Sequence, residues 1–199
     1  MMRRWLTLAG LLWCSCLGNP FAQAAGEGVT VTTLRGVHPV LIRNEHNILL
    51  QIVVDVQGEK EVRLKAMHFA FDKSDDVGDL ASLGLFATGD KQEFSPTSPF
   101  GKTIDPARAV AFRADLALRR GKNVFWLSGR LKPTADLSHR IAAICSSAET
   151  TEGNLPAKDL SAGIRQRIWI ALRKHNLIFS ISGYAPATVC LGQEDARIE

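Results

Sequence analysis

The stretch Ile48-Leu49-Leu50-Gln51-Ile52-Val53-Val54-Asp55-Val56 decides the fold class of this sequence. Every second residue from Ile48 to Val56 is a branched apolar residue, whereas Gln51 and Asp55 lie on the opposite face. This period of two is typical of a β-strand with one face in a core, and it differs from the period of 3.6 that a helix requires. A polar turn follows at 57–61. The next strand is expected from Val62 to Phe71, with a β-bulge between Ala66 and Met67 where the apolar phase slips by one residue.

The same period continues outward along the chain from residue 29 to about residue 148. Further strands are predicted at 81–87, 110–114, 124–131 and 140–146, with a tight turn at 120–123. A long loop rich in Ser and Pro, 89–103, is expected to cross one end of the domain. Short strands at this spacing predict an all-β protein. We expect residues 25–150 to form an antiparallel β-sandwich of the jelly-roll or immunoglobulin-like type.

The N-terminus has the three parts of a signal peptide. Arg3 and Arg4 precede an apolar stretch over 6–17, and Ala22-Gln23-Ala24 gives a small-x-small pattern. The sequence therefore predicts a signal peptide over residues 1–24, cleaved before Ala25. A protein with this leader is exported to the periplasm, the cell surface or the medium. The apolar stretch is too short to span a bilayer, so we expect no membrane association after cleavage.

Charge and composition argue against a nucleic-acid-binding protein. The 199 residues carry 24 basic and 20 acidic side chains, a net charge of +4, and 46% are apolar. This is ordinary globular composition. Loss of Arg3 and Arg4 with the signal peptide lowers the net charge by two, and no basic cluster with interleaved aromatic residues remains. Nucleic-acid binding is therefore not expected.

No catalytic or metal-binding motif stands out. The five histidines lack ligand spacing, and we expect no metal and no cofactor. The acidic run of Asp72, Asp75, Asp76 and Asp79 fails the EF-hand pattern and is expected to be a solvated, capping turn, with a weak calcium site as the minor alternative. Of the four cysteines, Cys145 and Cys190 lie outside the signal peptide. A buried free thiol at Cys145 is favoured, although pairing of the two stays open.

The C-terminal quarter is expected to divide into three parts. Residues 151–163 are small and polar and predict a linker, and residues 164–175 predict a strand. A basic helix over 164–175 is the alternative, because Ile164, Ile168 and Leu172 are four residues apart. As a strand, one face carries the surface residues Arg165, Arg167, Trp169 and Arg173, which we interpret as an interdomain or ligand-binding surface. The other tryptophan of the sandwich, Trp126, lies on the most apolar strand and is expected in the core.

Several blocks in order resemble the N-terminal domain of bacterial exo-α-sialidases (BNR-repeat neuraminidases). The first blocks are His38-Pro39-Val40-Leu41 with Ile48–Val56, then 79–89, then Phe100-Gly101. The most informative block combines Leu118, Gly121, Asn123, Phe125, Trp126 and Leu127, followed by Ala135-Asp136 and the strand at 139–146. The resemblance covers about residues 35–150, and 164–174 resembles the lead-in to the catalytic propeller.

The resemblance implies a β-sandwich that accompanies a glycosidase of sialoglycans. In such enzymes an Arg-Ile-Pro motif, Asp-boxes and a Tyr/Glu nucleophile pair follow the lead-in, and this sequence contains none of them. No catalytic residue is carried over, and we expect the chain to be inactive by itself. The implied partner is a sialidase propeller that is missing from this chain, and residues 176–199 are interpreted as an atypical, frameshifted or truncated tail. The alternative function is a stand-alone exported glycan-binding or adhesion module.

Overall fold

A computed structural model describes residues 28–36, 38–161 and 164–169 of the chain. Eleven strands and one short 3-10 helix form in this part. They are β1 (Val29–Leu34), β2 (Val40–Leu41), β3 (Asn47–Val56), β4 (Val62–Ala70), η1 (Val77–Asp79), β5 (Leu80–Gly89), β6 (Ala109–Leu118), β7 (Gly121–Leu131), β8 (Arg140–Ile141), β9 (Ile144–Thr150), β10 (Gly153–Asp159) and β11 (Gln166–Trp169). The predicted signal peptide, Cys190, Arg173 and the predicted tail lie outside the described residues. Within those residues, no helix is long and apolar enough to cross a membrane.

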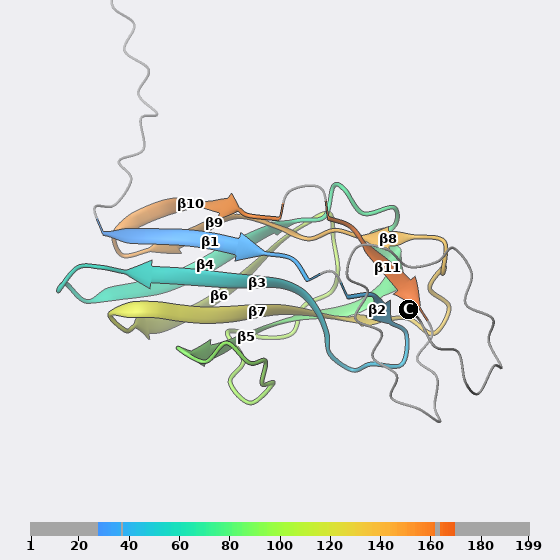
Figure 1. The fold of residues 1–199 in the computed structure, drawn as a ribbon, viewed down its shortest axis with the longest axis horizontal. Coiled ribbons are helices and arrows are strands. Elements are labelled where there is room, and N and C mark those ends of the chain that lie inside the picture. The colour runs from blue at the N-terminus through green and yellow to red at the C-terminus, as the bar shows by residue number, and fades with distance from the viewer. Residues whose placement is uncertain (1–27, 37, 162–163, 170–199) are drawn as a thin grey trace, which may run out of the picture.

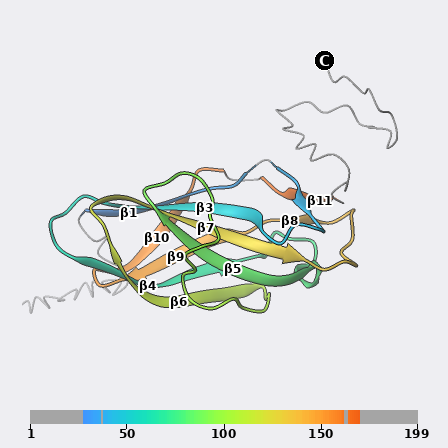
Figure 2. The ribbon, with the colours of Figure 1, turned by 90° about the horizontal axis from the view of Figure 1, so that it is seen from below.

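Eight strands form one continuous sheet in the order β5-β7-β3-β1-β10-β9-β4-β6. The sheet folds over on itself, so that β1, β3, β7 and β5 face β10, β9, β4 and β6 in two layers (Figure 2). Neighbouring strands are antiparallel except β1 and β10, which run parallel where the two layers join. The all-β sandwich predicted from the sequence is thus confirmed, with this one parallel pair as the exception.

The core fills the space between the two layers. Ile52 and Val54 of β3 point into it, as do Leu64 and Phe69 of β4, and all four side chains are buried. The rings of Phe69 and Phe112 meet edge to face, with centroids 5.8 Å apart. Burial of this many apolar side chains is the main stabilising contribution to the fold.

Register shifts set the phase of β3 and β4. The register of β3 against β7 shifts between Ile48 and Leu50, which leaves Ile48 half-buried and places Leu49 in the core. The predicted inward position of Ile48 was therefore wrong by one residue. In β4 the register shifts between Leu64 and Ala66, one residue before the predicted bulge.

The structure corrects two boundaries near the end of the sandwich. The expected single strand over 140–146 is two strands, β8 and β9, that belong to different sheets. The expected linker over 151–163 contains β10, which pairs with β9 on one side and with β1 on the other. The prediction of a linker failed because Leu155 is the only fully buried side chain of β10, so the strand has little apolar pattern.

The long loop after β5 does not cross the end of the sandwich as predicted. Its second half runs along the free edge of β5 instead, since Phe100 N donates to Leu85 O at 2.7 Å and Leu83 exchanges both backbone hydrogen bonds with Ile104. Covering an edge strand in this way removes a site for pairing with other chains.

A second, three-stranded sheet lies at one end of the sandwich. Its order is β2-β11-β8, with β11 parallel to β2 and antiparallel to β8 (Figure 1). β11 confirms a strand over 166–169, so the helical alternative was wrong there.

Candidate functional site

Strand β11 carries two of the four surface residues that the sequence singled out, Arg167 and Trp169, and Arg165 directly precedes the strand. Arg167 is exposed, and Arg165 and Trp169 are half-buried, whereas Ile168 between them is fully buried. The alternation of the two faces is as predicted. The fourth residue, Arg173, lies outside the described residues. Because its main chain is hydrogen-bonded on both sides, with Ile42 N donating to Trp169 O at 2.9 Å and Ile168 N to His139 O at 3.4 Å, β11 is a fixed element and not a loose extension.

A buried polar network ties the start of this segment to the sandwich. The Arg35 side chain, at the end of β1, is fully buried and forms an ion pair with Asp159 at the end of β10. The backbone N–H of Arg35 donates to Ser161 Oγ at 2.6 Å, and its guanidinium donates to the carbonyl of Ile164. These contacts hold Asp159, Ser161 and Ile164 against the end of β1, because the buried guanidinium would otherwise lose its partners.

Gln166 completes the attachment from β11 itself. Its side chain is buried, and Nε2 donates to the carbonyl oxygens of Ile48 at 2.9 Å and His38 at 3.1 Å. The roles of Arg35, Asp159 and Gln166 were not predicted from the sequence. A lone arginine next to glycine and a polar segment give no periodic signal, so only the three-dimensional path of the chain reveals their role.

The acidic turn before β5 is a capping element that also contacts β8 and Arg165, the residue before β11. Asp76 Oδ1 accepts from Gly78 N at 2.7 Å at the start of η1. Asp75 accepts from Arg140 N at 2.9 Å and pairs with the Arg165 guanidinium. These contacts, first that to Arg165, lower the pKa of the Asp75 carboxyl. The capping interpretation of this turn is therefore supported by its contacts.

Asp79 and His139 form the centre of the one group of possible metal ligands in the described residues, with Asp76 as the third member. The buried Asp79 carboxylate is already engaged, since Oδ2 lies 2.8 Å from His139 Nδ1 and Oδ1 accepts from Asp136 N at 3.1 Å. The hydrogen bond to Asp79 raises the pKa of His139. Both carboxylate oxygens of Asp79 thus have a structural partner, and the cluster fixes the loop before β8.

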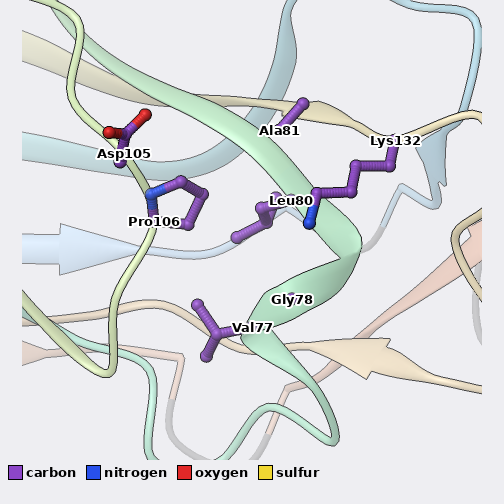
Figure 3. A pocket seen from close by; sticks show the side chains of 7 residues that line it. All are labelled: Val77, Gly78, Leu80, Ala81, Asp105, Pro106 and Lys132. Atoms are coloured by element: carbon purple, nitrogen blue, oxygen red, sulfur yellow. The ribbon is translucent and has the colours of Figure 1, made fainter.

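One hollow, of about 270 Å³, lies on the other side of this turn (Figure 3). In Figure 3, Asp105 and Pro106 lie on one side of β5 and Lys132 lies on the other, with Leu80 between them. The remaining lining is Val77, Gly78 and Ala81. One carboxylate and one amine among small apolar groups offer few convergent polar contacts for a ligand.

A second hollow, of about 180 Å³, opens on the outer face of β5 and β7. It is lined by Glu45, His46, Ser82, Gly84, Phe86, Thr103, Ser128 and Arg130, and we call it the β5–β7 groove. Ser82 lies opposite Arg130, and Gly84 lies opposite Ser128, across the antiparallel β5–β7 pair. The strands therefore hold these side chains on one face in fixed positions.

An aromatic cluster forms one wall of the β5–β7 groove. The rings of His46 and Phe94 both contact Phe86, with centroids 5.3 Å and 5.6 Å apart, and Phe94 reaches Trp126 at 6.3 Å. Trp126 is half-buried on this outer face, and its Nε1 donates to Thr88 Oγ1 at 2.9 Å. The expectation of Trp126 in the core was wrong, because the long loop with Phe94 covers the outer face of β7 and makes that face apolar as well.

Cys145 and His68 have structural roles. Cys145 is buried, and burial raises the pKa of its thiol to about 12, which makes it a poor nucleophile. Its pairing with Cys190 stays untested. His68 Nε2 lies 2.8 Å from Glu149 Oε1 on the outer face of β4.

The fold and these surfaces define a class: an all-β sandwich domain with a second small sheet that fixes the path of its C-terminal strand. Residues 29–153 match the family described as the N-terminal domain of BNR-repeat neuraminidase. The chain belongs to this family. The resemblance predicted from the ordered sequence blocks is thereby confirmed.

Two relatives show how far the similarity extends. The chain is 23% identical over 190 residues to a sialidase of Bacteroides fragilis (strain YCH46), a match that covers 81% of this chain and 34% of the relative. Among solved structures, the Hadza microbial sialidase Hz136 has the same fold with a TM-score of 0.58 at 19% identity, covering 69% of this chain and 31% of that one. The chain thus spans about a third of the length of each.

Proposed function

We propose that the chain is the non-catalytic N-terminal accessory domain of an exo-α-sialidase, a glycosidase of sialoglycans, and that it holds a catalytic propeller domain in a fixed orientation. The observation that carries this proposal is the buried attachment of β11. Arg35 binds Asp159 and the carbonyl oxygen of Ile164, and Gln166 attaches β11 to the sandwich. A strand that is fixed on the sandwich gives the residues after it a defined starting point, which a loose linker would not provide.

The surface near this attachment has features that are expected of an interface with another domain. Leu34 and Leu160 directly adjoin the Arg35–Asp159 pair in the sequence, and their exposed fractions of 49% and 59% are high for leucine. Exposed apolar side chains beside a rigid chain exit are typical of a surface that another domain covers. Arg167 and Trp169 on the outward face of β11 add a polar and an aromatic contact to the same proposed interface.

The family relationship supports a sialidase as the neighbour. Both relatives are named sialidases, and each is about three times the length of the matched part. The printed sequence contains no Arg-Ile-Pro, so we expect no turnover of sialosides by this chain. We also propose that the protein is exported, a proposal that rests on the leader pattern of residues 1–24.

Sequencing of the coding DNA and an activity assay of the purified chain test the proposal. The DNA that follows codon 170 is resequenced and translated in all frames, and the purified chain is assayed with a fluorogenic sialoside. We expect an Arg-Ile-Pro motif and Asp-boxes in the adjoining coding sequence and no turnover by the chain alone. An adjoining sequence without either motif would contradict the accessory role, and turnover by the chain alone would contradict its non-catalytic nature.

A second function has an observation in its favour. The β5–β7 groove is lined with polar side chains and a phenylalanine ring, which suits a stand-alone glycan-binding or adhesion module. The two functions differ in what they require. The accessory role needs the β11 surface and a catalytic partner, whereas the binding role needs the groove alone.

A further inference from the structure

We propose that the β5–β7 groove binds one uncharged sugar ring. The inference goes beyond the accessory role, because the groove and the β11 attachment use different residues. A domain that docks on a catalytic partner and a domain that stands alone can both use such a groove.

The polar groups of the groove are of three complementary kinds. Arg130 only donates hydrogen bonds, Glu45 only accepts them, and the hydroxyls of Ser82, Thr103 and Ser128 do both. A sugar hydroxyl both donates and accepts, so one ring with several hydroxyls can satisfy all three kinds at once. Few other small ligands carry as many two-way groups.

The charges of the groove select against ions. Within the described residues, neither Glu45 nor Arg130 has an ion-pair partner, and both side chains are exposed. One positive and one negative group on the same hollow leave it with no net charge. Arg130 attracts an anionic ligand and Glu45 repels it, and the reverse holds for a cationic ligand, so an ion gains no net attraction, whereas an uncharged ligand can bond to both groups.

The wall and the floor of the groove fit a ring. Phe86 lines the groove with a side chain that is only 8% exposed and is held by His46 and Phe94 from two sides, so it forms a fixed apolar edge rather than an open stacking face. The floor is Gly84 beside the buried Ser128, and a Cβ on Gly84 would meet the Phe86 ring at 2.9 Å. The absence of a side chain at Gly84 keeps the floor of the groove open.

The size and the rigidity of the groove limit the ligand. Its volume of about 180 Å³ is below the roughly 300–1,000 Å³ of pockets for drug-sized ligands, so a single ring is the expected occupant. The lining from β5 and β7 is fixed by strand pairing. Little ordering is therefore needed on binding, although a few hydrogen bonds to one ring give only weak, about millimolar affinity.

The experiment is a nuclear magnetic resonance titration of the purified full chain, labelled with ¹⁵N. The probes are glucose, galactose, mannose and N-acetylglucosamine, with N-acetylneuraminate and inorganic phosphate as anions, each raised to tens of millimolar. We expect at least one of the four uncharged sugars to give saturable shifts at Ser82, Thr103 and Ser128. Binding of either anion more tightly than every uncharged sugar would overturn the proposal, as would the absence of saturable shifts with all four.

Three variants locate the binding. Ser82→Trp places a large side chain in the groove and is expected to abolish the shifts. The control, Ala117→Trp, places the same side chain on the exposed face of β6, away from the groove, and is expected to leave the shifts unchanged. Arg130→Ala removes a charged donor from an exposed position and is expected to weaken binding about tenfold. Dispersed spectra show that each variant is folded. Undiminished binding by folded Ser82→Trp would overturn the proposed site.

Discussion

The fully buried Arg35 guanidinium and the half-buried Asp159 carboxylate form an ion pair that joins the end of β1 to the end of β10. The two strands run parallel at the point where the two layers of the sandwich meet. The pair thus lies both at the joint between the layers and at the exit of the chain toward β11. A fully buried guanidinium is stable only with its partners in place, so this pair couples the fold of the sandwich to the position of β11.

Breaking this pair is expected to destabilise the protein strongly. Asp159→Asn leaves the Arg35 guanidinium buried without a countercharge, which costs about 3–5 kcal/mol of unfolding free energy in comparable cases. Asp115→Asn, which breaks the exposed pair with Arg63, is the matched control and is expected to shift the unfolding midpoint only slightly. Urea unfolding of both variants measures the difference. Equal midpoints for the two would contradict the importance of the buried pair.

Two glycines with similar backbone angles are expected to respond differently to alanine. Gly101 and Gly121 have φ values of +80° and +85°. At Gly121 a Cβ would meet nothing within 4 Å, so Gly121→Ala is expected to cost about 1–2 kcal/mol from the left-handed backbone alone. At Gly101 the Cβ would lie 2.7 Å from the carbonyl oxygen of Arg113, so Gly101→Ala is expected to cost clearly more. Thermal unfolding compares them, and an equal loss would contradict the close approach of the long loop to β6.

The stability of the fold is expected to depend on pH through His139. Its hydrogen bond to Asp79 raises the pKa of the folded imidazole, and the charges of Asp136 and Asp75 act in the same direction against the cost of desolvation. A raised pKa means that the contribution is fully present below the unfolded value of about 6.5 and is lost as the pH rises through the folded value. The stability advantage of the wild-type protein over His139→Gln should therefore be larger at about pH 5.5 than at about pH 8.5. An advantage that is constant with pH, measured by urea unfolding, would argue against this interaction.

Export of the protein is expected to remove residues 1–24. N-terminal sequencing of the exported product should begin at Ala25, because Ala22-Gln23-Ala24 supplies the small side chains that signal peptidase requires. Ala24→Leu should retain the longer precursor, and Ala25→Leu, beyond the small-x-small pattern, is the matched control. A product from the cell that begins at Met1 would contradict the signal peptide.

The strands with a clear period of two could be predicted from the sequence, and those without it could not. Val54 alternates with Asp55 on β3, and this contrast sets the strand and its buried face directly. β10 has Leu155 as its one buried anchor and contains Pro156, which normally argues against a paired strand. Its place in the sheet depends on partners far away in the sequence, β1 and β9, and no local pattern encodes them.

The sites were harder to predict than the fold, for a physical reason. The alternation on β7 shows that Trp126 and Phe125 point to opposite faces, but not which face meets the core. That choice depends on Phe94, whose loop has no periodicity and whose contact with Trp126 spans many residues of sequence. By contrast, the two faces of β11 were predicted correctly, because Ile168 alternates with the polar Arg167 and so marks the inward side.

The accessory role is the central claim, and capture of the native protein tests it most directly. An antibody against the sandwich is used to isolate the protein from the cells that make it, and the captured polypeptides are sequenced by mass spectrometry. The account predicts peptides with an Arg-Ile-Pro motif and Asp-boxes, either in the same polypeptide or bound to it. Recovery of the sandwich alone, with no peptide from a sialidase catalytic domain, would contradict it.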